Sequence, residues 1–298
     1  MGELCKKYLV PPFSTLDTKQ GYWQRRKREW KAIGLQSDAG RSKDLLGSGG
    51  LKQLAEKLGQ NLTGTSVFDP VLCEVIYNWF SIKGGTVYDP FAGGSVRGIV
   101  AEMLGRNYIG IDLSQRQVDA NQLNADKLKV YPVWHCDDSK NADKYLDDET
   151  ADLVFSCPPY HDLEKYSNHP LDLSNMSYED FLKAYSEIIS IACRKLKNNR
   201  FAVFVVGDIR DKKGAYKDFI SATKRLFIDN GLCLYNEFVL LEQFGTAPMR
   251  AGKQFRAKRK VVKVHQNVLV FYKGDIEKIR ETYSNNFEWV DLSNYIKE

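Results

Sequence analysis

Three aspartates follow three consecutive predicted strands, where they could bind a nucleoside. Asp89 ends the first strand and opens a glycine turn at Gly93, Asp112 ends the second strand, and Asp138 follows the third. Glycine lets a backbone approach a ligand closely, and the helix that follows offers free N–H groups. Asp112 lies 19 residues after Gly93, a spacing typical of carboxylates that accept hydrogen bonds from ribose hydroxyls. Asp138 could then accept from an adenine amino group, the alternative being that these aspartates only cap helices.

The most specific signal in the chain ends the fourth predicted strand and reads Ser156-Cys157-Pro158-Pro159-Tyr160. Two prolines fix the backbone as it leaves the sheet and keep the carbonyl oxygens there out of the ladder, so they can accept hydrogen bonds from a ligand. Tyr160 offers a flat ring on which a base can stack. The sequence therefore predicts a rigid group of acceptors beside an aromatic platform.

Such acceptors suit methyl transfer to an exocyclic amine of a base. The lone pair of that nitrogen is delocalised into the ring, so the nitrogen attacks a methyl sulfonium poorly unless it becomes pyramidal. Acceptors that hold its two N–H groups out of the ring plane favour this geometry in the transition state. The reaction then requires no strong general base.

Alternating strand and helix patterns position these residues. Strands are expected at Thr86–Tyr88, Tyr108–Ile111, Val130–Trp134, Asp152–Phe155, Phe201–Val206, Leu232–Leu241 and Val264–Tyr272. Helices between most of them predict an α/β fold with a Rossmann-like, seven-stranded and mostly parallel sheet that binds ligands at its carboxyl ends. An irregular excursion joins the last two strands, so we expect an antiparallel C-terminal hairpin.

Composition places the chain among globular proteins. Its 298 residues are 43% hydrophobic and 27% charged, which excludes disorder, coiled coil and a membrane protein. We expect a basic and aromatic N-terminal extension over 1–62, a catalytic domain over 63–275 with an insertion at 243–263, and an acidic tail over 276–298. Six scattered cysteines and no secretory signal predict a cytoplasmic protein without a bound metal.

Basic residues are concentrated in the insertion, although the net charge of the whole chain is only +5. Seven basic residues and no acidic one lie from Arg250 to Lys263. We expect DNA contacts from Arg250, Lys253, Arg256, Arg259 and Lys260, the alternative being a solvated basic loop. Residues 25–28 lie between Trp23 and Trp30, and would form either a second DNA clamp or a helix that packs its tryptophans on the core.

These motifs together resemble the S-adenosylmethionine-dependent DNA amino-methyltransferases, which modify adenine N6 or cytosine N4, and most closely the compact methylases of phages and prophages. The resemblance covers about Thr65 to Asp275. It implies that S-adenosylmethionine is the cofactor and that double-stranded DNA is the substrate, with catalysis by residues 157–160. The cofactor-binding residues that it implies are Ser66, Phe68, Asp89, Phe91, Ala92, Gly93, Asp112 and Asp138.

Two departures from the family pattern leave alternatives open. The glycine turn reads Gly93-Gly94-Ser95 instead of GSG, and Cys157 stands where Asp, Asn or Ser is usual. Either the thiol substitutes for serine, or Ser156 or the Pro158 carbonyl replaces it as acceptor. The target is therefore cytosine N4 or adenine N6. The alternatives are an RNA methyltransferase, a cytosine-C5 enzyme with Cys157 as nucleophile, and an inactive DNA-binding protein. Such small recognition elements predict a short or relaxed recognition site, or a homodimer.

Overall fold

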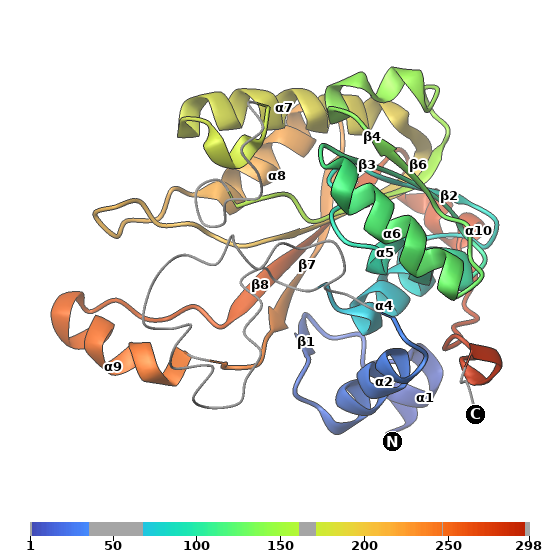
Figure 1. Ribbon diagram of the computed structural model, residues 1–298, viewed down its shortest axis with the longest axis horizontal. Coiled ribbons are helices and arrows are strands. Elements are labelled where there is room, and N and C mark those ends of the chain that lie inside the picture. The colour runs from blue at the N-terminus through green and yellow to red at the C-terminus, as the bar shows by residue number, and fades with distance from the viewer. Residues whose placement is uncertain (1, 36–67, 161–170, 246, 296–298) are drawn as a thin grey trace.

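The computed structural model describes residues 2–35, 68–160, 171–245 and 247–295. An eight-stranded sheet crosses the molecule in the order β1-β7-β8-β6-β5-β2-β3-β4 (Figure 1). The strands are β1 (Thr15–Asp17), β2 (Thr86–Asp89), β3 (Asn107–Asp112), β4 (Val133–Cys136), β5 (Ala151–Ser156), β6 (Leu196–Val206), β7 (Cys233–Leu241) and β8 (His265–Lys273). Only β8 runs antiparallel to its neighbours, which are β6 and β7. The Rossmann-like, mostly parallel sheet and its C-terminal hairpin are thus confirmed.

The expected number of seven strands is wrong by one, because the N-terminal segment adds β1. Thr15 pairs with Val239 in a parallel ladder on β7, which would otherwise be the edge of the sheet. The Val239 N–H donates to the Ser14 carbonyl at 2.8 Å, and the Thr18 hydroxyl donates to the Leu241 carbonyl at 2.8 Å. A strand of three residues is too short to show a period-two pattern, so only its tertiary pairing reveals it.

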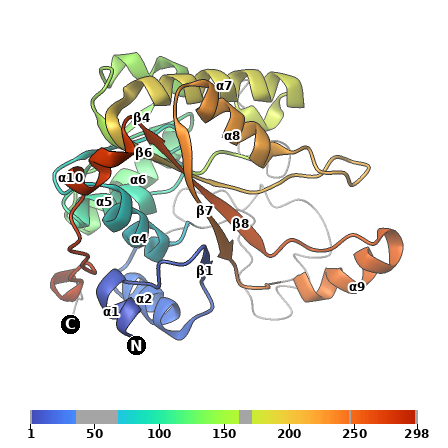
Figure 2. The ribbon, with the colours of Figure 1, turned by 180° about the vertical axis from the view of Figure 1, so that it is seen from behind.

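Helices cover both faces of the sheet (Figure 2). One face carries α2 (Gly21–Ala32), α4 (Pro70–Phe80), α5 (Val96–Met103) and α6 (Gln115–Lys127), and the other carries α7 (Tyr178–Lys195) and α8 (Phe219–Asp229). Side chains alternate between the two cores: Val87 of β2 packs with the first group and Tyr88 with the second. The remaining helices are α1 (Glu3–Tyr8), α9 (Ala247–Lys258), α10 (Ile279–Thr282) and 3-10 turns at Ser139–Lys144, Leu173–Asn175, Ile276–Lys278 and Ser293–Tyr295. Among the described residues, no helix has the length and apolar character needed to span a membrane.

Helix α2 packs its tryptophans into the core, as one of the two alternatives for this segment expected. Trp23 and Trp30 are fully buried against the α4 side of the sheet. Arg26 faces inward as well, and its Nε and Nη2 donate to the buried Glu74 carboxylate at 2.9 and 2.6 Å. The same guanidinium donates to the Val290 carbonyl at 2.5 Å, so it joins the two ends of the chain. Because Arg26 is used inside the protein, α2 is a structural element and the clamp interpretation fails for this residue.

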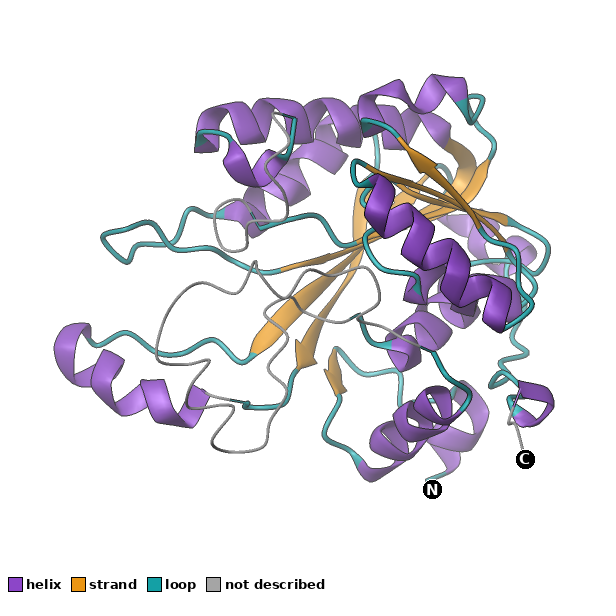
Figure 3. Cartoon of the chain, viewed as in Figure 1, coloured by secondary structure: helices purple, strands orange, loops and turns teal. Residues whose placement is uncertain are grey.

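The excursion between β7 and β8 contains a helix, α9, where the sequence analysis expected irregular structure. Pro248, Ala251, Gly252 and Phe255 recur at helical spacing and line one side of it. The helical period is hard to detect in the sequence because basic residues separate these positions and Gly252 contributes no apolar side chain. Helix α9 lies away from the two cores, at the end of an arm (Figure 3).

We predict that Gly98→Ala destabilises the fold. A Cβ at Gly98 of α5 would lie 2.6 Å from Cζ2 of Trp134 and 3.0 Å from Cδ1 of Tyr108, both buried rings. Such overpacking costs about 1–3 kcal/mol. Gly252→Ala in α9 is the matched control, since a Cβ there meets no atom within 4 Å. It should leave stability unchanged or raise it by about 0.5–1 kcal/mol through helix propensity. Urea unfolding of both variants tests this, and equal stabilities would contradict it.

Candidate functional site

The turn after β2 is built around a buried carboxylate. Asp89 Oδ2 accepts from Arg97 Nε at 2.5 Å and from the Tyr108 hydroxyl at 2.7 Å. Its Oδ1 accepts from the Ser156 hydroxyl at 2.5 Å and from the Phe91 N–H at 3.2 Å. Asp89 is fully buried, and these four donors come from β3, α5, β5 and the turn itself. The buried carboxylate therefore fixes the conformation of the turn.

Arg97 completes this network, and sequence reasoning gave it no role. One of its terminal nitrogens donates to the carbonyls of Phe91 and Ala92 at 2.7 and 2.9 Å. Its guanidinium also lies 4.5 Å from the centre of the Phe68 ring, which is half-buried. Burial alone would lower the pKa of Arg97, but the adjacent Asp89 carboxylate raises it, so the guanidinium stays charged. The cation thus fixes Phe68 and the turn relative to each other.

Gly93 and Asp112 meet at the carboxyl ends of β2 and β3. Gly93 has a φ of +52°, a conformation that favours glycine, and its N–H donates to Asp112 Oδ2 at 2.9 Å. Ser114 N–H donates to the other oxygen, Oδ1, at 2.8 Å. The buried Asn121 side chain donates to the Gly93 carbonyl at 2.7 Å. Each Asp112 oxygen keeps a further lone pair for a donor such as a hydroxyl.

Burial raises the pKa of the Asp112 carboxyl to about 6, although the two backbone N–H groups lower it. The group is consequently ionised at neutral pH and becomes protonated in mildly acidic solution. A half-buried carboxylate that is already oriented by amides is a good acceptor for paired hydroxyl groups.

The two acidic residues after β4 differ in how firmly neighbouring side chains hold them. Asp137 is held by the side chains of Asn141, Lys144 and Tyr145, which keep the pKa of its carboxyl well below the usual range against the effect of burial. Asp138 is half-buried and caps the next turn, with Oδ1 accepting from the Lys140 N–H at 3.0 Å. The capping interpretation is therefore correct for Asp138, and its Oδ2 lies 3.6 Å from Lys140 Nζ.

Two predicted cofactor residues remain to be placed. Phe91 is half-buried, and its ring centre lies 5.9 Å from that of Tyr185. Ser66 lies outside the residues that the structure describes.

The segment after β5 lies directly beside the glycine turn. The hydroxyl of Ser156 is fully buried, donating to Asp89 and accepting from the Phe91 N–H at 3.2 Å. The suggestion that Ser156 could replace Cys157 as acceptor is therefore wrong, because its hydroxyl faces the turn. Cys157 is half-buried, with its Sγ 3.7 Å from the Tyr160 hydroxyl.

Gln266 is a further residue at this position that sequence reasoning missed. It lies in β8 and its Nε2 donates to the Tyr160 hydroxyl at 2.7 Å. A Cβ at Gly207, the residue after β6, would lie 3.8 Å from the Tyr160 ring. Tyr160 is thus held between β5, β6 and β8. Gln266 reaches Tyr160 because β8 lies between β7 and β6 in the sheet. No local sequence pattern predicts this strand order.

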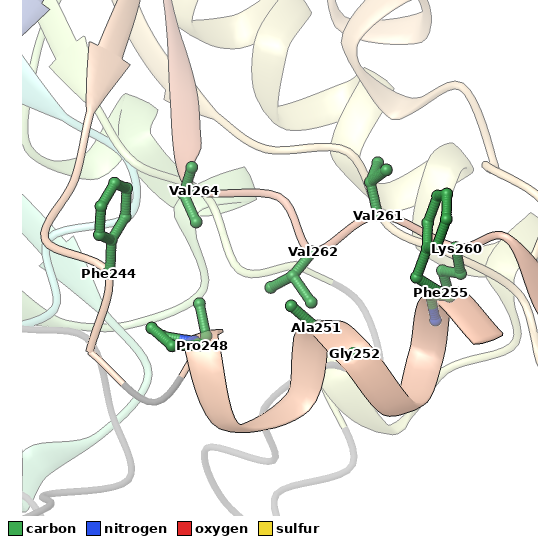
Figure 4. Close-up of a pocket in the computed structure, with 10 residues that line it drawn as sticks. Phe244, Pro248, Ala251, Gly252, Phe255, Lys260, Val261, Val262 and Val264 are labelled. Carbon is green, nitrogen blue, oxygen red and sulfur yellow. The ribbon is translucent and has the colours of Figure 1, made fainter. Parts of the chain in front are cut away.

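The basic residues of the insertion lie on and after α9. Exposed positions are Arg250, Lys253, Arg256 and Arg259, and Lys260 is half-buried. None of these five forms a salt bridge with any described residue. The Arg259 guanidinium lies 5.2 Å from the Phe255 ring centre, and Phe255 and Lys260 line an apolar hollow of about 490 Å³ (Figure 4). The arm therefore presents cations that have no salt-bridge partner within the described part of the chain, four of them at exposed positions.

We predict that Ser156→Ala lowers stability even though it removes a single oxygen. The change removes the hydroxyl donor to the buried Asp89 Oδ1, which keeps only the longer contact of 3.2 Å with the Phe91 N–H, and losing this buried hydrogen bond costs about 1–3 kcal/mol. The control is Ser221→Ala in α8, whose hydroxyl has no comparable role and whose loss should change stability little. Chemical denaturation measures both, and equal unfolding midpoints would rule out a structural bridge at Ser156.

Comparisons with known proteins support the site. A family model described as a DNA methylase matches residues 47–123, which contain the glycine turn and Asp112. The type II methyltransferase M.HinfI of Haemophilus influenzae is 32% identical over 83 residues, covering 28% of this chain. The chain spans only 23% of the length of that relative.

Solved structures similar to this chain have low sequence identity to it. An S-adenosylmethionine-dependent methyltransferase from Methanosarcina mazei is 13% identical with a TM-score of 0.47, over 67% of this chain and 97% of that one. Magnesium protoporphyrin IX methyltransferase from Synechocystis, solved with bound S-adenosylmethionine, is 14% identical with a TM-score of 0.44, over 78% and 95%. The resemblance that the motifs indicated is confirmed for residues 47–123, which contain the glycine turn and match the DNA methylase model, and the similarity to M.HinfI agrees with it.

Proposed function

We propose that this chain transfers a methyl group from S-adenosylmethionine to the exocyclic amine of a flipped base in double-stranded DNA. The observation that carries the proposal is the Ser156 hydroxyl, which joins the glycine turn to the segment Cys157–Tyr160 through Asp89. Methyl transfer requires donor and acceptor in fixed alignment. One buried hydrogen-bonded bridge between the two loops supports such alignment.

The residues around the turn fit the cofactor. Asp112 would accept hydrogen bonds from the ribose hydroxyls and Asp138 from the adenine amino group, while Phe68, Phe91, Ala92 and Gly93 would border the methionine part. Asp89 then acts as a positioning residue, because all its described contacts are internal. The cofactor supplies an electrophilic methyl group on a sulfonium.

The segment after β5 would hold the substrate. The base stacks on Tyr160, whose hydroxyl is oriented by Gln266 at 2.7 Å. The Cys157 Sγ and the Pro158 carbonyl accept from the amine N–H groups, so the nitrogen lone pair turns towards the methyl group. A nitrogen–carbon bond forms as the sulfur–carbon bond breaks, and the methylated amine loses one proton to water. A thiol has nearly the shape of a serine hydroxyl but accepts more weakly, so the proline carbonyl takes the larger share.

The test is nucleoside mass spectrometry of duplex DNA, and of RNA in a parallel reaction, after incubation with the protein and isotopically labelled S-adenosylmethionine. We expect labelled N4-methylcytosine or N6-methyladenine, and a loss of about 100-fold or more in Tyr160→Ala, since the base loses its stacking platform. Labelled 5-methylcytosine would make Cys157 a nucleophile and overturn the amine mechanism. Label in RNA but not DNA would assign an RNA substrate, and cofactor binding without transfer would indicate an inactive DNA-binding protein.

We predict that cofactor affinity falls as the solution becomes more acidic than pH 6. Burial raises the pKa of Asp112 to about 6, and the ribose hydroxyls need its ionised form as acceptor. Below that pH, the dissociation constant should rise towards about tenfold per pH unit, because binding must first remove the proton. Calorimetric titration with S-adenosylmethionine between about pH 4.5 and 7 measures this. Asp112→Asn should bind weakly at every pH and lose the dependence, whereas an unchanged profile in that variant would assign the effect to another group.

A further inference from the structure

Two segments extend from the sheet on the same side, and only one of them, the arm that carries α9, was expected to bind DNA. The second is the loop 207–218, which follows β6 and extends in the same direction as α9 (Figures 1 and 2). Strand β8 is hydrogen-bonded both to β6, with Asn267 opposite Val206, and to β7. The two segments therefore start from neighbouring strands.

The loop 207–218 is preformed by its own hydrogen bonds. Arg210 and Tyr216 form an antiparallel bridge, and the Arg210 guanidinium lies 3.7 Å from the Tyr216 ring centre. Asp211 Oδ1 accepts from the N–H groups of Gly214 and Ala215 at 2.6 and 2.9 Å, which closes the tip. Asp208 Oδ1 accepts from the Phe219 N–H at 3.0 Å and so caps α8 at the base of the loop. Asp208 and Asp211 thus serve the loop's own geometry, while the third acidic residue, Asp218, lies 4.0 Å from Arg225 of α8.

The tip of the loop presents positive charge. Lys212 and Lys213 are exposed, and within the described residues neither forms a salt bridge. Tyr216 is 45% exposed beside them. Lysines and an aromatic ring on a fixed turn suit contacts with phosphate and sugar. Because the loop backbone is already ordered, binding would restrict little more than the lysine side chains.

Tyr160 lies where both segments begin. A Cβ at Gly207, the first residue of the loop, would lie 3.8 Å from its ring. On the other side, Gln266, close to the end of the α9 arm, donates to its hydroxyl at 2.7 Å. A duplex that delivers a base to Tyr160 must therefore pass close to both segments.

We propose that the loop 207–218 is a second DNA-contacting arm that binds the sugar-phosphate backbone opposite α9. The duplex then lies between the two arms, with the flipped base at Tyr160. Lys212 and Lys213 contact phosphates without reading sequence, and the cations of α9 contact the backbone from the other side. This proposal rests on the proposed function, since it needs DNA as the substrate.

The experiment measures the salt dependence of binding to a fluorescent duplex of about 30 base pairs and mixed sequence, between about 50 and 200 mM salt. Each lost phosphate contact lowers the slope of log affinity against log salt by about 0.9, so Lys212→Gln with Lys213→Gln should lower it by about 1.8. Arg250→Gln with Lys253→Gln and Arg256→Gln should lower it by up to about 2.7. The control, Lys127→Gln with Lys129→Gln, changes two exposed lysines at the end of α6, towards the opposite edge of the sheet.

The outcomes separate the two proposals. A loop variant with the wild-type slope, beside an α9 variant with a reduced one, would overturn the second arm and leave the proposed function intact. A control that loses as much slope as the loop variant would also overturn it, because the effect would then come from net charge alone. A wild-type protein that neither binds the duplex nor methylates it would refute the proposed function itself.

Discussion

The structure depends on one buried charge. Placing the Asp89 carboxylate inside a protein is costly unless a counter-charge and several donors satisfy it. Arg97 supplies the counter-charge, while Tyr108 and Ser156 supply hydroxyl donors from β3 and β5. These contacts tie three adjacent strands and the first turn of α5 to one point. The turn that follows β2 can therefore expose its backbone to a ligand without losing its shape.

This network explains why the two loops of the site behave as one unit. Ser156 precedes Cys157 by one residue, and its hydroxyl reaches both the Asp89 carboxylate and the Phe91 N–H. A shift of the end of β5 relative to the glycine turn would break these buried hydrogen bonds, which costs more than breaking bonds exposed to water. Under the proposed function, the alignment of methyl donor and amine would therefore be set by buried contacts.

Much of this could be predicted from the sequence where the signal is local. The parallel strands, Gly93 and Asp112 follow from hydrophobic periodicity and from spacing within one strand-turn-helix unit. Three features depend on tertiary pairing and were missed: β1 on the edge of β7, the inward-facing Arg26, and Gln266 beside Tyr160. Arg26 stands among other basic residues in the sequence, which favours an exposed position, and only the structure shows its buried partner, Glu74. The helix α9 was missed because basic residues and a glycine interrupt its apolar face.

The buried and the exposed charges of this chain differ in how strongly salt screens them. Asp89 and Arg97 are buried and satisfy each other, so they fix geometry and are shielded from changes in salt. Lys212 and Lys253 are exposed on separate segments, so salt in the solvent screens their charges. Under the proposed function, the buried pair would fix the alignment at the methyl group, and the exposed lysines would hold and release the duplex. Tyr160 lies between these two regions, and Gln266 donates to its hydroxyl at 2.7 Å.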